Sequence, residues 1–302
     1  MTPGDFLPPI LSKGVRWLRR RIIGSKADVF LRGGAVPWSP GYDAYRKHVI
    51  GQFLADESIS ACFRLGQRLP EGYGVGLDER CIEYPWLLAN LPDGPGTLLD
   101  AGSCLNHEFL LATPQLAGRK MHILTLAPER AAYWPRGISY LYEDLRSIPI
   151  RDGFYDVVAC LSTIEHVGCD NSQYTRSTTP DINRPDDYLA VMRELCRVLR
   201  PGGTLFLTVP FGIGRNFGAF WQFDRERLAR AVEAFGPTSE VSERFYKYNR
   251  EGWNIAGPED CAACEYVTWL TLPNEQRPSS IPVESDKAAA ARAVACVRIE
   301  KK

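Results

Sequence analysis

The stretch Leu98-Leu-Asp-Ala-Gly-Ser-Cys-Leu-Asn106 joins a short apolar run to a turn of small and polar residues. Residues 97–100 predict a strand that is buried on both faces, because the run does not alternate apolar and polar residues. The turn around Gly102 allows the backbone to approach a ligand closely. A helix that follows such a turn offers free N–H groups to an anion. Taken alone, the pattern is also typical of any tight connection between a strand and a helix.

The same alternation continues toward the C-terminus. We expect further strands at 122–126, 138–142, 155–161, 204–209, 240–248 and 291–299, and helices at 187–199 and 224–235. Strands separated by helices indicate a parallel sheet with crossover connections. The chain is therefore predicted to have an α/β fold around a seven-stranded, mostly parallel sheet.

The N-terminal part has a different pattern. Residues 41–90 carry apolar side chains at helical spacing, and the turn formers Asn90-Leu-Pro-Asp-Gly-Pro-Gly96 follow them. We predict an N-terminal helical cap at residues 1–90 and a main domain at residues 91–302.

Composition restricts the kind of partner. The chain has 302 residues, of which 36 are Lys or Arg and 36 are Asp or Glu, so its net charge does not favour a nucleic acid. It has no apolar run of the ~20 residues that a membrane span needs and no signal-peptide pattern, and its nine scattered cysteines favour reduced thiols in a cytoplasmic protein. The basic run at residues 13–26 predicts either weak contact with a membrane surface or a solvated helix.

Two downstream stretches carry most of the functional information. The first runs from Glu143-Asp-Leu-Arg-Ser-Ile-Pro to Ile164-Glu-His-Val167, and the second is Met192-Arg-Glu-Leu-Cys-Arg-Val-Leu-Arg-Pro-Gly-Gly-Thr-Leu-Phe-Leu-Thr-Val209. Together with the turn at Gly102 they resemble class I (Rossmann-like) S-adenosylmethionine-dependent methyltransferases over residues 97–210. The runs Ile164–Gly168 and Val209–Gly212 more narrowly resemble methyltransferases of bacterial polysaccharide and glycan biosynthesis.

The resemblance implies a Rossmann-like methyltransferase sheet, S-adenosylmethionine as the cofactor, and a role for each matched position. The turn at Asp100, Ala101 and Gly102 would lie against the methionine part of the cofactor, Asp144 would accept from the adenine amino group, and Leu161 and Ser162 would lie near the transferred methyl. The complete set of predicted cofactor-binding residues is Asp100, Ala101, Gly102, Ser103, Asn106, Thr125, Leu126, Glu129, Asp144, Leu145, Leu161 and Ser162.

The sequence departs from the family pattern at two places. Cys104 and Asn106 stand where the family usually has glycines, so their side chains could crowd the cofactor, or Asn106 could bond to it. Thr125 stands where an acid usually holds the ribose hydroxyls, and Glu129 lies four residues on. These departures leave a catalytically silent, cofactor-binding partner protein as an alternative to an enzyme.

His166 and Glu165 are the predicted catalytic residues. His166 follows the fourth strand and has the pKa class of a general base, although a structural role is an alternative for it and the favoured one for Glu165. We expect a small-molecule or glycan acceptor that is methylated at oxygen. The chain lacks the Asn/Asp-Pro-Pro-aromatic motif of nucleic-acid amino-methylating enzymes, whereas a protein acceptor stays open. No residue cluster indicates a metal, and the spacing of Cys261 and Cys264 is attributed to chance.

Overall fold

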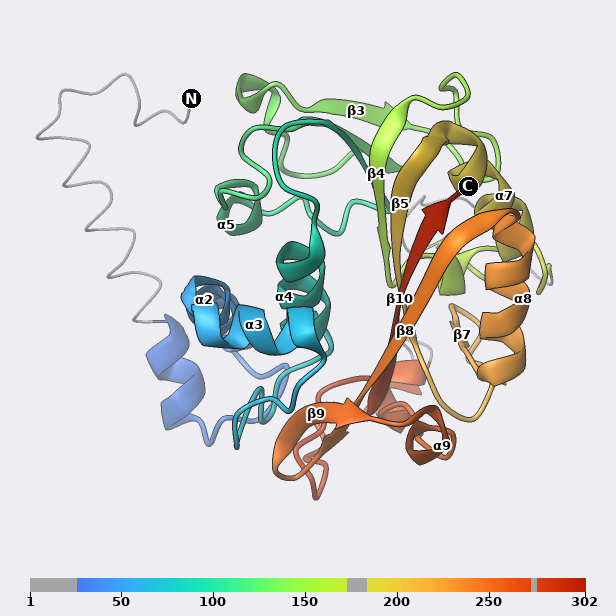
Figure 1. Ribbon diagram of the computed structural model, residues 1–302. Helices are drawn as coiled ribbons and strands as arrows, with labels where there is room; N and C mark the ends of the chain where they lie inside the picture. Colours follow the sequence, from blue (N-terminus) through green and yellow to red (C-terminus); the bar gives the residue numbers. More distant parts are fainter. Residues whose placement is uncertain (1–25, 173–183, 273–275) are drawn as a thin grey trace, which may run out of the picture.

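The computed structural model describes residues 26–172, 184–272 and 276–302. Its centre is an eight-stranded sheet with the order β3-β2-β1-β4-β5-β10-β8-β9 (Figure 1). The strands are β1 (Thr97–Ala101), β2 (Lys120–Thr125), β3 (Ser139–Tyr142), β4 (Tyr155–Leu161), β5 (Leu199–Pro210), β8 (Thr238–Asn249), β9 (Gly252–Ala256) and β10 (Ala293–Lys301). The strands from β3 to β5 in this order are parallel neighbours, whereas β10 runs antiparallel to both β5 and β8.

The sheet confirms the predicted α/β class and its Rossmann-like, mostly parallel arrangement. The strand count differs by one, because β9 extends the sheet beyond the seven predicted strands. It forms a hairpin with β8 across the turn at Asn249–Gly252, where Gly252 has a φ of 102°. The chain reverses there within two residues, which is the geometry that glycine permits.

Helices cover both faces of the sheet, which explains the continuous apolar runs in the strands. Along β4, Val157 and Ala159 belong to the core beneath α2 (Tyr42–Ala55), α3 (Glu57–Leu65) and α4 (Arg80–Asn90). Val158 and Cys160 belong to the core on the opposite face, with α7 (Tyr188–Val198) and α8 (Arg225–Phe235). Alternate side chains of one strand therefore enter two different cores. Figure 1 shows the two helical layers on either side of the strands.

Helix α4 lies between the sheet and the other N-terminal helices. Its side chains from Cys81 to Leu88 are all buried, as expected for a helix that is covered on every side. The described N-terminal helices thus form one layer of the molecule, and the boundary at residues 90–91 stays a prediction. Of the basic run at residues 13–26, only Lys26 lies among the described residues.

Candidate active site

The turn after β1 is held by a buried carboxylate. Asp100 accepts hydrogen bonds from the backbone N–H of Cys104 at 3.1 Å and of Leu105 at 2.8 Å. Burial raises the pKa of Asp100 to about 7, although these two bonds favour its charged form. Gly102 and Ser103 have φ values of 115° and 64°. A Cβ atom on Gly102 would lie 2.1 Å from Oγ1 of Thr163, so only glycine fits there.

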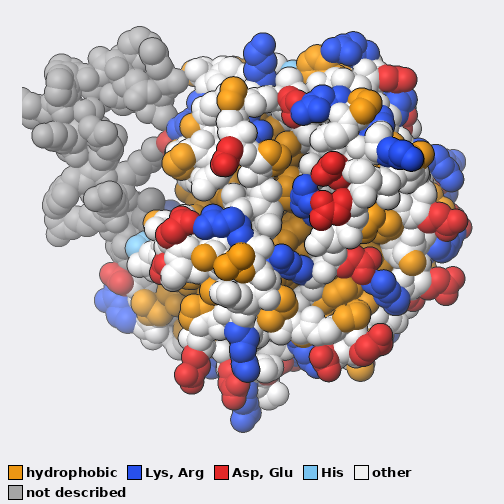
Figure 2. Space-filling view, in the orientation of Figure 1, with side chains coloured by type: hydrophobic (Ala, Val, Ile, Leu, Met, Phe, Trp, Pro, Cys, Tyr) orange, Lys and Arg blue, Asp and Glu red, His pale blue; other side chains and the backbone are white. Residues whose placement is uncertain are grey.

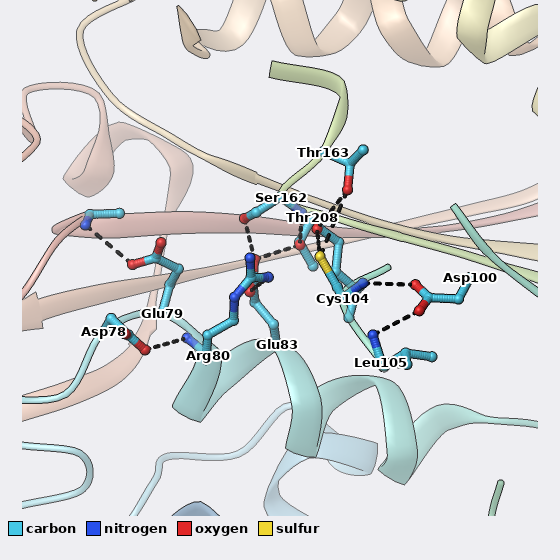
Figure 3. A network of polar contacts seen from close by, with 12 residues as sticks. Asp78, Glu79, Arg80, Glu83, Asp100, Cys104, Leu105, Ser162, Thr163 and Thr208 are labelled. Atoms are coloured by element: carbon cyan, nitrogen blue, oxygen red, sulfur yellow. Dashed lines mark hydrogen bonds and ion pairs between the residues drawn. The ribbon is translucent and has the colours of Figure 1, made fainter. Parts of the chain in front are cut away.

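The two side chains that replace family glycines are bound to the protein itself. The thiol of Cys104 donates to the carbonyl of Leu161 at 2.7 Å (Figure 3). The amide of Asn106 donates to the carbonyl of Ala131 at 3.0 Å and accepts from the hydroxyl of Tyr140 at 2.9 Å. Asn106 does not line the cavity at this turn, whereas Cys104 does. The helix after the turn, α5 (Glu108–Leu111), has only four residues.

An acid follows β3 at the adenine end of the predicted site. Asp144 pairs with Arg146 through contacts of 2.6–3.1 Å, and Arg146 also contacts Asp187 at 2.5 Å. Burial acts to raise the pKa of Asp144, but the hydrogen bonds and charge of Arg146 outweigh it, and the net shift is downward. Asp144 is therefore ionised at neutral pH and already has one cationic partner.

The end of β4 is joined to the N-terminal layer by a buried carboxylate from α4. Ser162 has a φ of 40°, and its hydroxyl donates to Oε1 of Glu83. The hydroxyl of Thr208 donates to the same oxygen at 2.6 Å, and Arg80 pairs with Oε2 at 2.6 Å. Glu83 is fully buried, so these donors replace the water that its charge has lost. Figure 3 shows this network between α4 and the strands.

The two predicted catalytic residues have different surroundings. Nδ1 of His166 donates to the carbonyl of Ala219 at 2.8 Å, which in a neutral imidazole leaves the lone pair on Nε2. Burial lowers the pKa of His166, so the ring is neutral at pH 7. Glu165 is 3% exposed, burial raises its pKa well above the usual range, and its Oε2 has no hydrogen-bond partner among the described residues.

One cavity of about 670 Å³ lies at the carboxyl ends of β1, β2 and β4. It brings together most of the predicted site residues, namely Gly102, Ser103, Thr125, Leu126, Glu129, Asp144, Leu145, Ser162 and His166. The others do not line it and lie behind its wall: Asp100, Ala101, Asn106, Leu161 and Glu165. Parallel α/β sheets place their ligand crevices at this end of the strands.

The opposite wall of the cavity comes from the N-terminal layer and was not predicted as part of the site. Its residues are Trp38, Arg46, Asp78, Glu79, Arg80 and Tyr84. Arg46 pairs with Asp78, and burial raises the pKa of Glu79 to about 8, with the charges of Asp78 and Glu83 adding to the shift. The sequence held one signal: Asp78-Glu-Arg80 and Glu83 open an otherwise apolar helix, and such residues are rarely buried without partners.

Tyr266 and Ala290, from the C-terminal part of the chain, also line the cavity. Phe220 packs against His166 and Tyr266, with ring centroids 5.7 and 4.8 Å away, whereas Phe211 is buried in the core. The face in Figure 2 carries basic and acidic side chains intermixed, without a broad patch of one sign.

The described residues hold no cluster of three or more His, Cys, Asp or Glu side chains that could bind a metal, and Cys261 and Cys264 are buried free thiols. No helix in the described ranges is both long and apolar enough to cross a bilayer.

The model of a methyltransferase-domain family matches residues 100–207, about a third of the chain. The chain carries a methyltransferase domain. The match begins at Asp100 and ends within β5, so it covers the turn, the β4 motif and the strand-end wall of the cavity. The predicted enzyme class, an S-adenosylmethionine-dependent methyltransferase, and its cofactor are confirmed.

Solved structures of methyltransferases and of a cyclase are similar to this chain at low identity. A 1,6-didemethyltoxoflavin-N1-methyltransferase of Burkholderia thailandensis is 13% identical, with 69% of this chain and 72% of that chain covered and a TM-score of 0.40. A geranyl diphosphate methyltransferase is 16% identical, with coverages of 73% and 78% and a TM-score of 0.44. The [4+2]-cyclase SpnF is also 16% identical, with coverages of 71% and 78% and a TM-score of 0.43. At these scores the likenesses carry no argument about the acceptor. No curated protein matches the chain in sequence.

Proposed function

We propose that this methyltransferase binds S-adenosylmethionine across the carboxyl ends of β1, β2 and β4 and methylates a small-molecule or sugar acceptor at oxygen. The observation that carries the proposal is a cavity that gathers His166 and the motif residues from the loops after β1, β2, β3 and β4. Asp144 and Leu145 would hold the adenine, Thr125 and Glu129 would lie beside the ribose, and the turn at Gly102 would face the methionine part.

The residues of the cavity fit such a cofactor. Gly102 lines the cavity with a φ of 115° and has no side chain to fill it, and Asp144, whose pKa the hydrogen bonds of Arg146 lower against the effect of burial, lines it after β3. S-adenosylmethionine supplies a methyl group on a positively charged sulfur. The protein has to hold the acceptor oxygen in line with that methyl, and the cavity walls provide this positioning.

His166 is the proposed general base. The bond from its Nδ1 to Ala219 fixes the ring and leaves Nε2 as the proton-accepting atom. A neutral ring can take the proton of an acceptor hydroxyl, whereas a ring that was already protonated could not. Glu165 lies behind the cavity wall, which supports a structural role for it.

The alternative of a catalytically silent cofactor-binding protein rests on the altered turn and the missing ribose acid. The structure offers less support for crowding by Asn106, because its amide bonds to Ala131 and Tyr140 and it does not line the cavity, whereas Cys104 does line it. Cofactor binding without turnover of any acceptor would favour this alternative.

We also propose a cytoplasmic location for the protein. The free cysteines of the described residues agree with it.

The first test is calorimetric titration with S-adenosylmethionine and S-adenosylhomocysteine. We expect micromolar binding that Asp144→Ala weakens by about tenfold or more, about 1.4 kcal/mol. The matched control is Glu251→Ala, which removes an exposed carboxylate from the turn between β8 and β9. Failure of the wild-type protein to bind either compound would contradict the proposed cofactor site.

A further inference from the structure

The N-terminal wall of the cavity has one carboxylate that its arginines do not neutralise. Arg46 and Arg80 each pair with a different carboxylate, Asp78 and Glu83 respectively. Glu79 lines the cavity and is only 9% exposed, and within the described ranges its side chain makes no ion pair. Burial raises its pKa to about 8, because a desolvated carboxylate without a cation is costly. A ligand that brings a positive charge to this wall would remove that cost.

Three cavity-lining side chains converge on residues 289–291, the segment just before β10. A backbone N–H of this segment donates to Oε2 of Glu79 at 3.3 Å, and a backbone carbonyl of the segment accepts from the indole N–H of Trp38. Tyr266 adjoins the same segment, because the residue that follows it donates its N–H to the segment at 3.1 Å. Oε1 of Glu79 is accessible and has no hydrogen-bond partner in the part of the chain that the structure describes. Figure 3 accordingly shows a contact at only one of the two oxygens.

This part of the cavity lies away from the proposed place of the methionine part of the cofactor. That part is proposed to lie beside the turn at Gly102, after β1. In the strand order, β4 and β5 separate β1 from β10, which residues 289–291 precede. Tyr266 and the proposed base His166 both pack against the ring of Phe220, with centroids 4.8 and 5.7 Å away. The subsite therefore faces the acceptor and lies next to the proposed base.

The groups around Glu79 are those that bind an ammonium ion. The Tyr266 hydroxyl makes no hydrogen bond within the described ranges, and burial raises its pKa well above the usual range, with the charge of Glu79 adding to the shift. A protonated amine has three N–H donors and a full charge, so it can bond to the carboxylate and to the phenol oxygen together. Trp38 and Tyr84 add aromatic rings to the cavity, and ring faces attract cations. A neutral hydroxyl could bond to the same oxygens but would leave the carboxylate without a cation.

We infer that Glu79, Tyr266 and Trp38 form an acceptor subsite for a protonated amine, and that the methyl acceptor is an alcohol, phenol or sugar that carries such an amine. This inference rests on the proposed function and names the substrate class of the same site. Glu79 determines the specificity for the amine, while His166 acts at the acceptor oxygen.

The test compares two pairs of probes, tyramine with tyrosol and glucosamine with glucose. Within each pair an ammonium group replaces a hydroxyl, and every probe carries an oxygen that can accept a methyl group. Each probe is titrated calorimetrically into protein that is already saturated with S-adenosylhomocysteine. Phosphate buffer at pH 7 is used, so that the buffer brings no competing amine.

The variants separate the charge from the rest of the subsite. Glu79→Gln removes the charge but keeps an oxygen for the N–H of residues 289–291. Tyr266→Phe removes the hydroxyl alone. Glu57→Gln is the matched control, because it removes a carboxylate that is 81% exposed on α3 in the same layer. Circular dichroism and thermal unfolding establish that each variant is folded.

We expect the wild-type protein to prefer the amine in at least one pair by about tenfold or more, the range of a charged hydrogen-bonded contact. Glu79→Gln should abolish this preference, Tyr266→Phe should reduce it, and Glu57→Gln should leave it unchanged. The preference is the readout, because a structural defect would weaken both probes of a pair alike.

The affinity for tyramine should also depend on pH. At pH 6 the carboxyl group of Glu79 holds a proton that the amine has to displace, so the affinity should rise by up to about tenfold per pH unit until about pH 8. Tyramine itself stays protonated in this range, as alkylamines do. Glu79→Gln should show no such rise. The charged and titratable groups that face Glu79 are Asp78, Arg80, Cys81, Glu83, Glu165 and Tyr266.

The outcomes separate the inference from the function beneath it. A wild-type protein that does not bind S-adenosylhomocysteine would overturn the proposed cofactor site and the subsite with it. Protein that binds it but prefers the amine in neither pair would overturn the subsite alone, as would an equal preference in the wild type and Glu79→Gln. If Glu79→Gln does not fold, an unchanged preference in Tyr266→Phe together with a flat pH dependence would overturn the subsite. Amine binding that saturating S-adenosylhomocysteine abolishes would also overturn it, because the amine would then occupy the place of the cofactor's own amino group.

Discussion

The two walls of the cavity differ in how they are built. The strand-end wall consists of loops that follow β1, β2, β3 and β4, and each contributes a few residues next to a strand end. The N-terminal wall consists of the beginning of α4 and the segments before it, and its polar groups are neutralised in pairs, such as Arg46 with Asp78 and Arg80 with Glu83. The first wall is organised by backbone geometry and the second by buried charge.

This difference predicts how substitutions in each wall destabilise the protein. A substitution in the strand-end wall acts by steric strain at positions with a fixed backbone conformation. A substitution in the N-terminal wall acts by leaving a buried charge without its partner, which costs more than an exposed ion pair contributes.

The largest effect is expected from Glu83→Ala. It leaves the largely buried Arg80 unpaired and removes the acceptor for the hydroxyls of Ser162 and Thr208. The free energy of unfolding should fall by about 3–5 kcal/mol, as for other broken buried pairs. Urea unfolding measures this loss in the free energy of unfolding. The control is Glu57→Ala, which breaks the exposed pair with Arg64 in the same layer and should cost less than about 1 kcal/mol. Equal losses in the two variants would refute the view that buried charge organises this wall.

The second effect tests the strand-end wall. Gly102→Ala places a Cβ atom 2.1 Å from Oγ1 of Thr163 in a backbone with a φ of 115°. Strain and overpacking together should lower the free energy of unfolding by about 2–4 kcal/mol and weaken S-adenosylhomocysteine binding. Gly118→Ala is the control, because no heavy atom lies within 4 Å of its Cβ position and its φ is not positive. Wild-type stability and affinity in Gly102→Ala would show that the turn can shift.

The strand-end wall could largely be predicted from sequence because its signals are local. Gly102, Asp144 and Ser162 each lie within a few residues of a strand end, so their place in the cavity follows once the strands are recognised. The direction in which a side chain points was harder to predict from the sequence. Asn106 was predicted beside the cofactor, but its amide bonds to Ala131 and Tyr140 away from the cavity. That contact joins segments about 30 residues apart, and no local pattern encodes it.

The N-terminal wall could not be predicted because it depends on how α4 packs across the sheet. Glu83 meets Thr208 over a sequence separation of 125 residues. Its sequence signal, a carboxylate within an apolar helix, indicates burial but does not identify the partner. Pro85 within α4 further weakens the helical pattern. Strand β9 was missed for a similar reason, since five residues that begin with glycine carry little strand signal until β8 is present to pair with them.

The smallest effect per unit of the variable that is changed is a dependence of stability on pH, which compares Glu79 of the N-terminal wall with Asp100, the carboxyl group that holds the turn behind the strand-end wall. Burial raises the pKa of Glu79 to about 8 and that of Asp100 to about 7. Both folded-state pKa values exceed those of the unfolded chain, so the native state binds protons more tightly and stability falls as pH rises between the two values. One such group contributes a slope of at most about 1.4 kcal/mol per pH unit. Asp100 makes the free energy of unfolding fall with rising pH up to about pH 7, whereas Glu79 does so up to about pH 8.

The comparison uses Glu79→Gln and Asp100→Asn, with urea unfolding at pH 5, 6, 7 and 8. The charged and titratable groups around Glu79 are Asp78, Arg80, Cys81 and Glu83 from the same segment, with Glu165 and Tyr266 from other parts of the chain. Because each variant lacks one titrating group, its difference from the wild type isolates that group. In Glu79→Gln, the free energy of unfolding should fall less steeply with rising pH than in the wild type up to pH 8. In Asp100→Asn, it should fall less steeply only up to pH 7. Parallel curves for Glu79→Gln and the wild type would mean that Glu79 is ionised in the folded protein, and that the N-terminal wall carries an uncompensated negative charge beside Asp78.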